Sequence, residues 1–330
     1  MQTGLEKIFV NAGYQISEAE LNAWRRMVTE YSAAFNSHPT PNLHINDVGK
    51  GELFRTDLIT SYLDDSIDDS NCSEMWDRHR RAILDHLRNQ NAELLLDPII
   101  RYAIYLTSGS SWSNVQLEYL KGKYNSERLS TILKENHQFS HTIVHESLET
   151  SESKINFATH LTEFFEHVSL TESEVSTIVE FGGGYGGMTE MLRMFFPSAT
   201  VYVIDFPELH IVQEAYLRRW NPVFIPPNSK IFEPKRGAIH LVSLYSVTQA
   251  KIVPDLLIGT WSISECDEET CYIIDHSSLV KSKHLLFGYR FRESPSPHLP
   301  NSFPRNWMLP RSKFHDFCFF AKNAHRYLFY

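Results

Sequence analysis

The stretch Thr177-Ile-Val-Glu-Phe-Gly-Gly-Gly-Tyr-Gly-Gly-Met188 joins a β-branched segment to a helical one through a loop made almost entirely of glycine. Glycine lacks a Cβ, so it readily adopts positive φ and lets a ligand approach the main chain. The run before the loop predicts a strand, and the apolar residues after it repeat at helical spacing until Pro197. The next β-rich run, Thr200 to Asp205, ends on an acid where nucleotide-binding sheets hold a ribose. The stretch therefore predicts a βαβ unit that binds a nucleoside-containing cofactor.

Two cofactors fit these glycines. Gly182-x-Gly184-x-x-Gly187 satisfies the dinucleotide fingerprint, in which a pyrophosphate rests on the helix N-terminus. Glu180-x-Gly182-x-Gly184-x-Gly186 instead places a carboxylate two residues ahead of the first glycine. A buried acid repels a pyrophosphate and suits S-adenosylmethionine, which carries an ammonium and a sulfonium and no phosphate. A third interpretation is a turn that binds nothing, with Glu180 merely hydrogen-bonded, but it makes the acids and the βαβ context coincidental.

The last half of the chain resembles the sugar O-methyltransferases, a family of S-adenosylmethionine-dependent enzymes. The blocks that carry the resemblance are Ile178-Val-Glu-Phe-Gly-Gly-Gly-Tyr-Gly-Gly-Met188, Val203-Ile-Asp-Phe-Pro-Glu-Leu209, Asp255-Leu-Leu-Ile-Gly-Thr-Trp-Ser-Ile-Ser-Glu265, His284-Leu-Leu-Phe-Gly-Tyr289 and His325-Arg-Tyr-Leu-Phe-Tyr330. Their order and spacing are more specific than any single block. The segment between Tyr289 and His325 departs from the family pattern, which makes it a candidate determinant of substrate identity. The resemblance implies a methyltransferase sheet that closes in an antiparallel hairpin.

Ligands of doubly wound sheets bind at the carboxyl ends of the parallel strands, so the residues that follow each strand are the cofactor-binding candidates. These candidates are Glu180, Gly182, Gly184, Tyr185, Gly186, Asp205, Phe206, Ser246, Val247, Thr260 and Trp261. We expect Asp205 to bind both ribose hydroxyls, with Phe206 against the adenine face. Glu180 is expected to hold the loop or the ammonium group, and Tyr185 to lie against the methionine portion. Trp261 fits a place beside the acceptor and a place in the core equally well.

Methyl transfer to a hydroxyl requires an aligned acceptor oxygen and a base that removes its proton. Glu265 is the first candidate base, because it stands next to Ser264 just beyond the predicted fourth strand. His276 is the second, because its ordinary pKa suits general-base chemistry, although its position also fits a helix surface. Further histidines near the predicted pocket are His298, His315 and His325. No carboxylate spacing demands a metal ion.

The composition excludes several other classes. The formal net charge is −9 and no segment forms a basic stripe, which argues against a nucleic-acid partner and favours a small polar or glycan substrate. The four cysteines lack the spacing of a zinc site or a disulfide framework. No window reaches the roughly twenty apolar residues of a membrane span, and the N-terminus has no signal-like apolar run. These features predict a cytoplasmic protein.

Two regions are predicted. Residues 1–170 are expected to be a mainly helical cap and a candidate homodimerisation surface, with helices after Ser17, after Ser73 and over Ile155 to Val168. Residues 171–330 are expected to be an α/β domain that binds S-adenosylmethionine on a Rossmann-like sheet.

The later strands of this sheet are predicted from apolar runs. The third, fourth and fifth strands are placed at residues 239–244, 255–258 and 284–289. The resemblance implies that the aromatic-rich runs 317–321 and 325–330 pair as the closing hairpin.

The sequence predicts an S-adenosylmethionine-dependent O-methyltransferase that acts on a hydroxyl of a sugar or a glycosylated small molecule. An NAD(P)-dependent oxidoreductase that uses the same glycine-rich loop is the enzymatic alternative. Glu180 and the 149 residues that remain after Phe181 argue against it, since a dehydrogenase usually adds a catalytic domain after a complete dinucleotide fold. A catalytically inactive methyltransferase-like binding protein is the non-enzymatic alternative.

Overall fold

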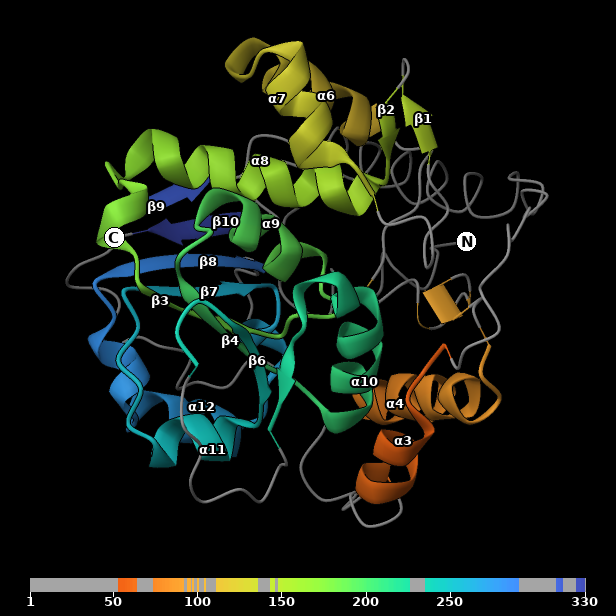
Figure 1. Cartoon of the computed structure of the whole chain (residues 1–330). Coiled ribbons are helices and arrows are strands. Elements are labelled where there is room, and N and C mark those ends of the chain that lie inside the picture. The colour runs from red at the N-terminus through yellow and green to blue at the C-terminus, as the bar shows by residue number, and fades with distance from the viewer. Residues whose placement is uncertain are drawn as a thin grey trace, which may run out of the picture.

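The centre of the molecule is an eight-stranded sheet with the order β5-β6-β4-β3-β7-β8-β10-β9 (Figure 1). The strands are β3 (Thr177–Phe181), β4 (Thr200–Ile204), β5 (Val223–Phe224), β6 (Ile239–Val242), β7 (Leu256–Thr260), β8 (His284–Arg290), β9 (Lys313–Asp316) and β10 (His325–Phe329). The computed structural model describes residues 53–63, 74–91, 94–95, 97, 100, 104, 111–135, 143–145, 148–225, 235–290, 313–316 and 325–329.

Six neighbouring strands, from β5 to β8, run parallel, and β10 pairs antiparallel with both β8 and β9. The chain leaves β3 toward β4 on one side and returns to β7 on the other, so the strand order reverses between β3 and β7. Open α/β sheets bind ligands at such a reversal. The predicted doubly wound methyltransferase sheet with a closing hairpin is therefore confirmed.

The sheet is covered on both faces, and alternate residues of each strand enter two separate cores. In β3, Ile178 packs toward α8 (Glu152–His167), α9 (Gly187–Phe195) and α10 (Pro207–Tyr216). The next residue, Val179, packs in the opposite core with α11 (Leu244–Gln249) and α12 (Glu268–Asp275). Strands buried on both faces read as continuous apolar runs, which is why these segments were recognisable in the sequence.

The predicted element boundaries differ from the structure at several points. The third strand ends at Val242, because Ser243 caps α11 by accepting a hydrogen bond from the Ser246 amide at 3.2 Å. In the closing hairpin, β10 pairs with β9 at Lys313–Asp316. The predicted hairpin partner, residues 317–321, directly follows β9 and lies outside the described residues. The short strand β5 was not predicted, since two residues carry no alternation signal.

The N-terminal half supplies further helices and a small hairpin. They are α3 (Thr56–Leu63), α4 (Glu74–Arg88), α6 (Ser111–Lys123), α7 (Ser126–Leu133), β1 (Ile143–His145) and β2 (Leu148–Thr150). The helices predicted after Ser73 and over Ile155 to Val168 are confirmed as α4 and α8, whereas the one predicted after Ser17 lies outside the described residues. The β1–β2 hairpin was not predicted, because its strands have only three residues each.

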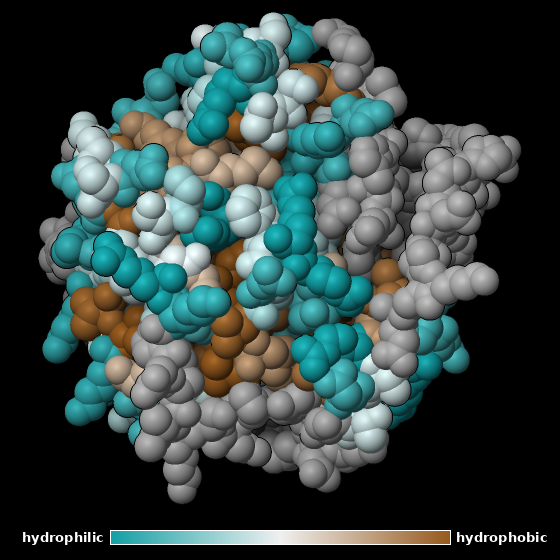
Figure 2. Space-filling view, viewed as in Figure 1, coloured by the Kyte–Doolittle hydropathy of each residue, from teal (hydrophilic) through white to brown (hydrophobic). Residues whose placement is uncertain are grey.

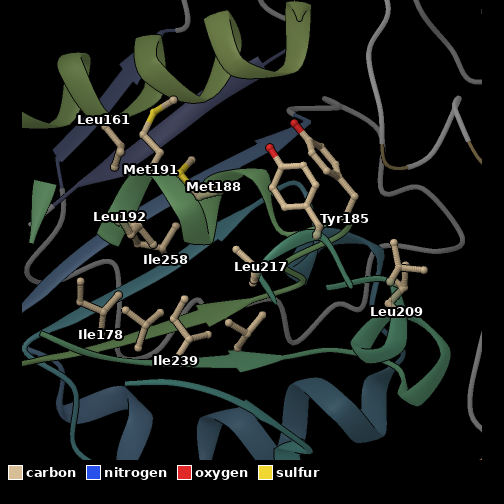
Figure 3. Packing of buried hydrophobic residues seen from close by; sticks show 14 of the residues in the cluster. Leu161, Ile178, Tyr185, Met188, Met191, Leu192, Leu209, Leu217, Ile239 and Ile258 are labelled. Carbon is tan, nitrogen blue, oxygen red and sulfur yellow. The ribbon is translucent and has the colours of Figure 1, made fainter. Parts of the chain in front are cut away.

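One core runs across the predicted boundary between residues 170 and 171. Leu161 of α8 packs with Met188 and Met191 of α9 and with Ile258 of β7 in a single buried cluster (Figure 3). The hairpin strand β10 joins the same cluster through Phe329. The hydrophobic core is therefore continuous across the predicted boundary.

A buried polar group ties α8 to α9 behind the glycine-rich loop. Lys154 of α8 and Glu190 of α9 form an ion pair, and both side chains are completely buried. Tyr216 of α10 donates a hydrogen bond to the same Glu190 carboxylate at 3.2 Å. Arg219 forms a second ion pair with Glu190 at 2.5 Å. Removing Glu190 would leave the buried Lys154 without its partner, at a cost of about 3–5 kcal/mol. The pair therefore fixes the helices that carry the loop.

Within the described part of the chain, no helix combines the length and apolar character needed to cross a bilayer. The face shown in Figure 2 is mainly hydrophilic, with hydrophobic areas between hydrophilic ones.

Candidate functional site

The strand register brings the predicted site residues to one edge of the sheet. Phe181 pairs with Ile204, so Gly182 and Asp205 follow their strands side by side. Ile258 pairs with Glu180, which places Thr260 alongside Gly182 on the other side of β3. The carboxyl ends of β4, β3 and β7 thus meet where the strand order reverses.

The glycine-rich loop uses conformations and contacts that a side chain would disturb. Gly182, Gly184 and Gly186 have φ values of +75°, +56° and +102°. A Cβ on Gly182 would overlap the side chain of Ser262, whose hydroxyl donates to the Phe181 carbonyl. The ends of β3 and β7 therefore touch at Gly182. A Cβ on Gly184 would make only ordinary contacts with Ile104, so its glycine is required by the positive φ.

Asp205 organises the loop. Its Oδ2 accepts hydrogen bonds from the Gly184 amide and from Nε2 of Gln213, both at 2.8 Å, and its Oδ1 accepts from the Phe206 amide at 2.9 Å. Gln213 also donates to the Gly184 carbonyl at 2.9 Å. Burial raises the pKa of Asp205 to about 7, despite these hydrogen bonds, which act in the opposite direction.

Glu180 lies beneath the same loop. Its side chain points to the α9 face of the sheet, where Thr189 donates a hydrogen bond to Oε2 at 2.5 Å. Burial raises the pKa of Glu180 to about 8; the Thr189 bond opposes this shift and the nearby Asp205 charge adds to it. The contact with Thr189 ties Glu180 to α9, the helix that follows the loop. A cation near the two acids would favour their ionised forms.

Two further acceptor atoms at this site have no hydrogen-bond partner within the described residues. They are Oε1 of Gln213 and Oε2 of Glu208, and both side chains are completely buried. Buried polar atoms are normally hydrogen-bonded, so each is a place where a donor from a ligand or a water fits. With Asp205, they give the ends of β4 and α10 an excess of acceptors. That excess suits the ribose hydroxyls and the ammonium of S-adenosylmethionine.

Three of the residues predicted to contact the cofactor are buried in the structure. Tyr185 is completely buried in the core, where its ring packs edge-on against Tyr216 at 4.9 Å, instead of lying at the predicted methionine position (Figure 3). It turns inward because Gly187 leaves room for its ring. Val247 packs in the core between the sheet and α11, and Ser246 is buried at the N-terminal cap of that helix, with its hydroxyl 3.0 Å from the Ser243 hydroxyl.

Trp261 follows β7 with the left-handed φ of +64°, a conformation that is strained for a bulky residue. Its amide donates to the Gly288 carbonyl at 2.6 Å, and its ring lies 4.7 Å from the ring of His160. His160 in turn is hydrogen-bonded to Tyr327 of β10. Trp261 is half-buried against the main core, so its ring packs and also borders the strand ends.

The two candidate bases have different surroundings. Glu265 ends the short helix η5 (Ile263–Glu265) after β7 and is half-buried, and its Oε2 accepts a hydrogen bond from Nε1 of Trp76 at 3.2 Å. His276 is exposed at the end of α12, where it stacks on Tyr272 at 3.9 Å. The structure thus joins Glu265 to the strand ends and places His276 on a helix surface. His298 and the side chains of His315 and His325 lie outside the described residues.

The sequence alone did not reveal that α4 contributes to this site. Trp76 of α4 contacts the ring of Phe206 at 5.7 Å, and the Arg80 guanidinium lies 4.7 Å above that ring. Arg80 also forms a buried ion pair with Glu208. Trp76 lies in the helix expected after Ser73, and nothing local in the sequence indicates its contact with Glu265, 189 residues later. Gln213 follows the block 203–209 that carries the resemblance, but no role was predicted for it, because its contacts depend on how α10 lies against the loop.

Comparisons with known proteins leave the family of this chain open. No protein-family model matches the sequence, and no curated protein matches it significantly. The structure is similar to a methyltransferase domain of bacterial CtHen1 (13% identity, 53% of this chain and 96% of that one, TM-score 0.33). It is also similar to the 16S rRNA methylase RmtB (11% identity, 83% of this chain and 96% of that one, TM-score 0.33). A third similar structure is the mitomycin 7-O-methyltransferase MmcR (13% identity, 68% of this chain and 53% of that one, TM-score 0.31). The TM-scores are below 0.5, so the fold assignment rests on the strand order. That order defines a Rossmann-like methyltransferase fold.

Proposed function

We propose that this protein is an S-adenosylmethionine-dependent O-methyltransferase whose acceptor is a hydroxyl of a sugar or a glycosylated small molecule. One observation carries the choice of cofactor: two buried acids, Glu180 and Asp205, lie under and beside the glycine-rich loop, with the pKa of each raised by burial. A pyrophosphate would add negative charge beside them. A ligand with an ammonium and a sulfonium supplies the positive charge that lets both acids ionise.

The residues divide the binding work by position. Asp205 and the unpartnered Oε2 of Glu208 are acceptors for ribose hydroxyls, and Phe206 offers a ring for the adenine. Glu180 and the loop glycines 182 and 184 lie at the end of β3, where the charged amino-acid portion would bind. This arrangement supports S-adenosylmethionine as the cofactor, as the resemblance to sugar O-methyltransferases implies. The similarities in fold do not identify the substrate, so the sugar acceptor rests on that resemblance.

S-adenosylmethionine would supply a methyl carbon that forms a bond to the acceptor oxygen as its bond to sulfur breaks, with that electron pair staying on sulfur. The acceptor hydroxyl must lose its proton, and Glu265 is the carboxylate at the end of β7 that can accept it. Trp76 orients this carboxylate by donating to Oε2 at 3.2 Å. The half-buried Trp261 and Thr260 border the same strand end and limit water there.

Titration calorimetry with S-adenosylhomocysteine and with NAD tests the cofactor. We expect S-adenosylhomocysteine to bind and NAD not to bind. Asp205→Ala should weaken binding of S-adenosylhomocysteine at least about tenfold, because it removes a charged acceptor and the anchor of the loop. Asp255→Asn is the matched control, since Asp255 is a hydrogen-bonded acid at the opposite end of the sheet. Binding of NAD alone would refute the proposal and favour the oxidoreductase.

A second experiment separates a catalyst from an inactive binding protein. Glu265→Gln should slow methyl transfer by about 10²–10⁴-fold, the usual contribution of a general base, and leave affinity for S-adenosylhomocysteine unchanged. Full activity in this variant would exclude Glu265 as the base. His276→Gln is its control, because His276 is exposed on α12, and it should retain activity.

A further inference from the structure

Helix α4 is a fixed wall of the site. Arg80 pairs with Glu208 at the start of α10, with the two side chains 8% and 1% exposed. Opening that contact would leave a buried charge without its partner, which is strongly unfavourable. The Arg80 guanidinium also packs on the Phe206 ring. A helix held in this way keeps its inner face in place while ligands come and go.

The inner face of α4 carries Trp76 across the strand ends. The indole contacts Phe206, which follows β4, and its Nε1 donates to Glu265, which follows β7. One side chain therefore spans the point where the strand order reverses. Any acceptor whose hydroxyl reaches Glu265 lies against this indole, whose flat apolar surface matches the C–H face of a sugar ring.

His79 stands next to Trp76 on the same face of α4. Its ring meets the indole edge-on at 5.4 Å, and the residue is 5% exposed. Neither of its ring nitrogens has a hydrogen-bond partner in the part of the chain that the structure describes. Burial lowers the pKa of His79, and the charge of Arg78 lowers it further, so the ring is neutral at neutral pH. A buried imidazole with two unsatisfied nitrogens indicates a polar ligand at that place.

We propose that the inner face of α4 is the acceptor wall of the enzyme, with Trp76 as the positioning residue of Glu265 and His79 as the hydrogen-bond partner of acceptor hydroxyls. This inference rests on the proposed function and specifies its acceptor as an uncharged sugar ring. A neutral imidazole provides one donor and one acceptor nitrogen, which matches two neighbouring hydroxyls. The carboxyl groups of Glu180, Asp205 and Glu265 at the strand ends disfavour a phosphorylated or carboxylated sugar.

Methyl transfer from radiolabelled S-adenosylmethionine tests this assignment. The probes are the methyl glycosides of glucose, galactose, mannose and rhamnose, with glucose 6-phosphate as the anionic counterpart. We expect at least one methyl glycoside to accept the label and glucose 6-phosphate to accept less. Failure of every glycoside, or preference for the phosphate, in a protein that binds S-adenosylhomocysteine would overturn the acceptor class and leave the cofactor assignment standing.

His79→Leu separates an acceptor contact from a packing role. The variant should raise KM for the glycoside about tenfold or more, the value of a lost hydrogen bond to a buried group. Its affinity for S-adenosylhomocysteine should stay the same, and its melting temperature should stay the same or rise, because two unsatisfied polar atoms are removed. A merely structural histidine would lower the melting temperature when replaced and leave KM unaltered.

Trp76→Phe keeps a ring on the wall and removes the donor to Glu265. We expect kcat to fall about tenfold with little change in KM, the signature of an interaction that serves the transition state. His210→Leu is the matched control for His79→Leu. His210, on α10, is also buried with an unpartnered ring nitrogen, but it packs against Phe224 of β5. An unchanged KM in His79→Leu would refute the acceptor wall. A protein that fails to bind S-adenosylhomocysteine at all would refute the proposed function first.

Discussion

The variant Glu180→Gln should become more stable relative to the wild-type protein as the pH rises. Burial raises the pKa of this carboxyl from 4.5 to about 8, so the folded protein binds its proton more tightly than the unfolded chain does. The contribution of Glu180 to the free energy of unfolding is therefore fully present below pH 4.5, the ordinary pKa of this carboxyl. It is lost progressively as the pH rises through about 8. One pKa unit corresponds to about 1.4 kcal/mol.

From these values, the wild-type protein should lose about 4 kcal/mol of unfolding free energy between about pH 5 and about pH 8.5 through Glu180. Glutamine has the same shape and does not ionise, so Glu180→Gln lacks this loss. Removing the Glu180 charge also eases the ionisation of its neighbour Asp205, which adds to the stability difference between the variant and the wild type. The stability difference between variant and wild type should increase steadily over this pH range.

Urea denaturation followed by far-ultraviolet circular dichroism, at several pH values and without ligand, measures this difference. Asp255→Asn is the control with the opposite sign. Although burial opposes it, hydrogen bonds from Lys283 and Ser176 lower the pKa of Asp255, so this variant should become less stable relative to wild type as the pH rises from the acid range. If the curve for Glu180→Gln is flat or falls with pH, the pKa of Glu180 is not raised in the folded protein, and burial does not dominate the ionisation of this carboxyl.

Two other substitutions probe the loop and the wall. Gly182→Ala should lower stability by about 1–3 kcal/mol and weaken S-adenosylhomocysteine binding, because it combines a φ of +75° with overlap onto Ser262. Adding Ser262→Gly should recover part of the stability in thermal melts, and no recovery would mean that the overlap is unimportant. Arg80→Met should cost about 3–5 kcal/mol in urea denaturation by leaving Glu208 buried without its cation. A loss below about 1 kcal/mol would place the pair among weakly coupled surface ions.

The parts of this fold that could be predicted from the sequence are those specified by local pattern. Strand, loop and helix are all encoded within thirty residues. That stretch contains the β-branched run before the glycines, the helix that follows them and the second strand, which ends at Asp205. Their carboxyl ends were correctly expected to meet at one edge of the sheet, because parallel pairing fixes the register. The N-cap of α12 is local in the same way: Asp267 is a residue type that helix N-caps favour, and it accepts the Thr270 amide at 2.6 Å.

The parts that could not be predicted depend on packing between distant segments. Tyr185 lies beside the loop in sequence, but it turns into the core because Gly187 leaves space for its ring. Trp76 reads as an apolar position of an amphipathic helix, and its contact with Glu265 exists only because α4 docks on α10. Periodicity shows which face of a helix is buried, and it carries no information about which surface covers that face.

The backbone strain of the molecule at this edge supports a binding role for it. Trp261, directly after β7, has a positive φ of +64°, which is strained for a tryptophan, whereas the φ of +75° at Gly182 after β3 is ordinary for glycine. A strained residue persists only where its surroundings hold it, and here buried ion pairs lie behind and beside the loop, Lys154 with Glu190 and Arg80 with Glu208. A bulky tryptophan in a left-handed conformation at a strand end gives no advantage to packing that an extended residue would not. We infer that the chain retains it because that backbone turn directs η5, and with it Glu265, toward the point where β3, β4 and β7 meet.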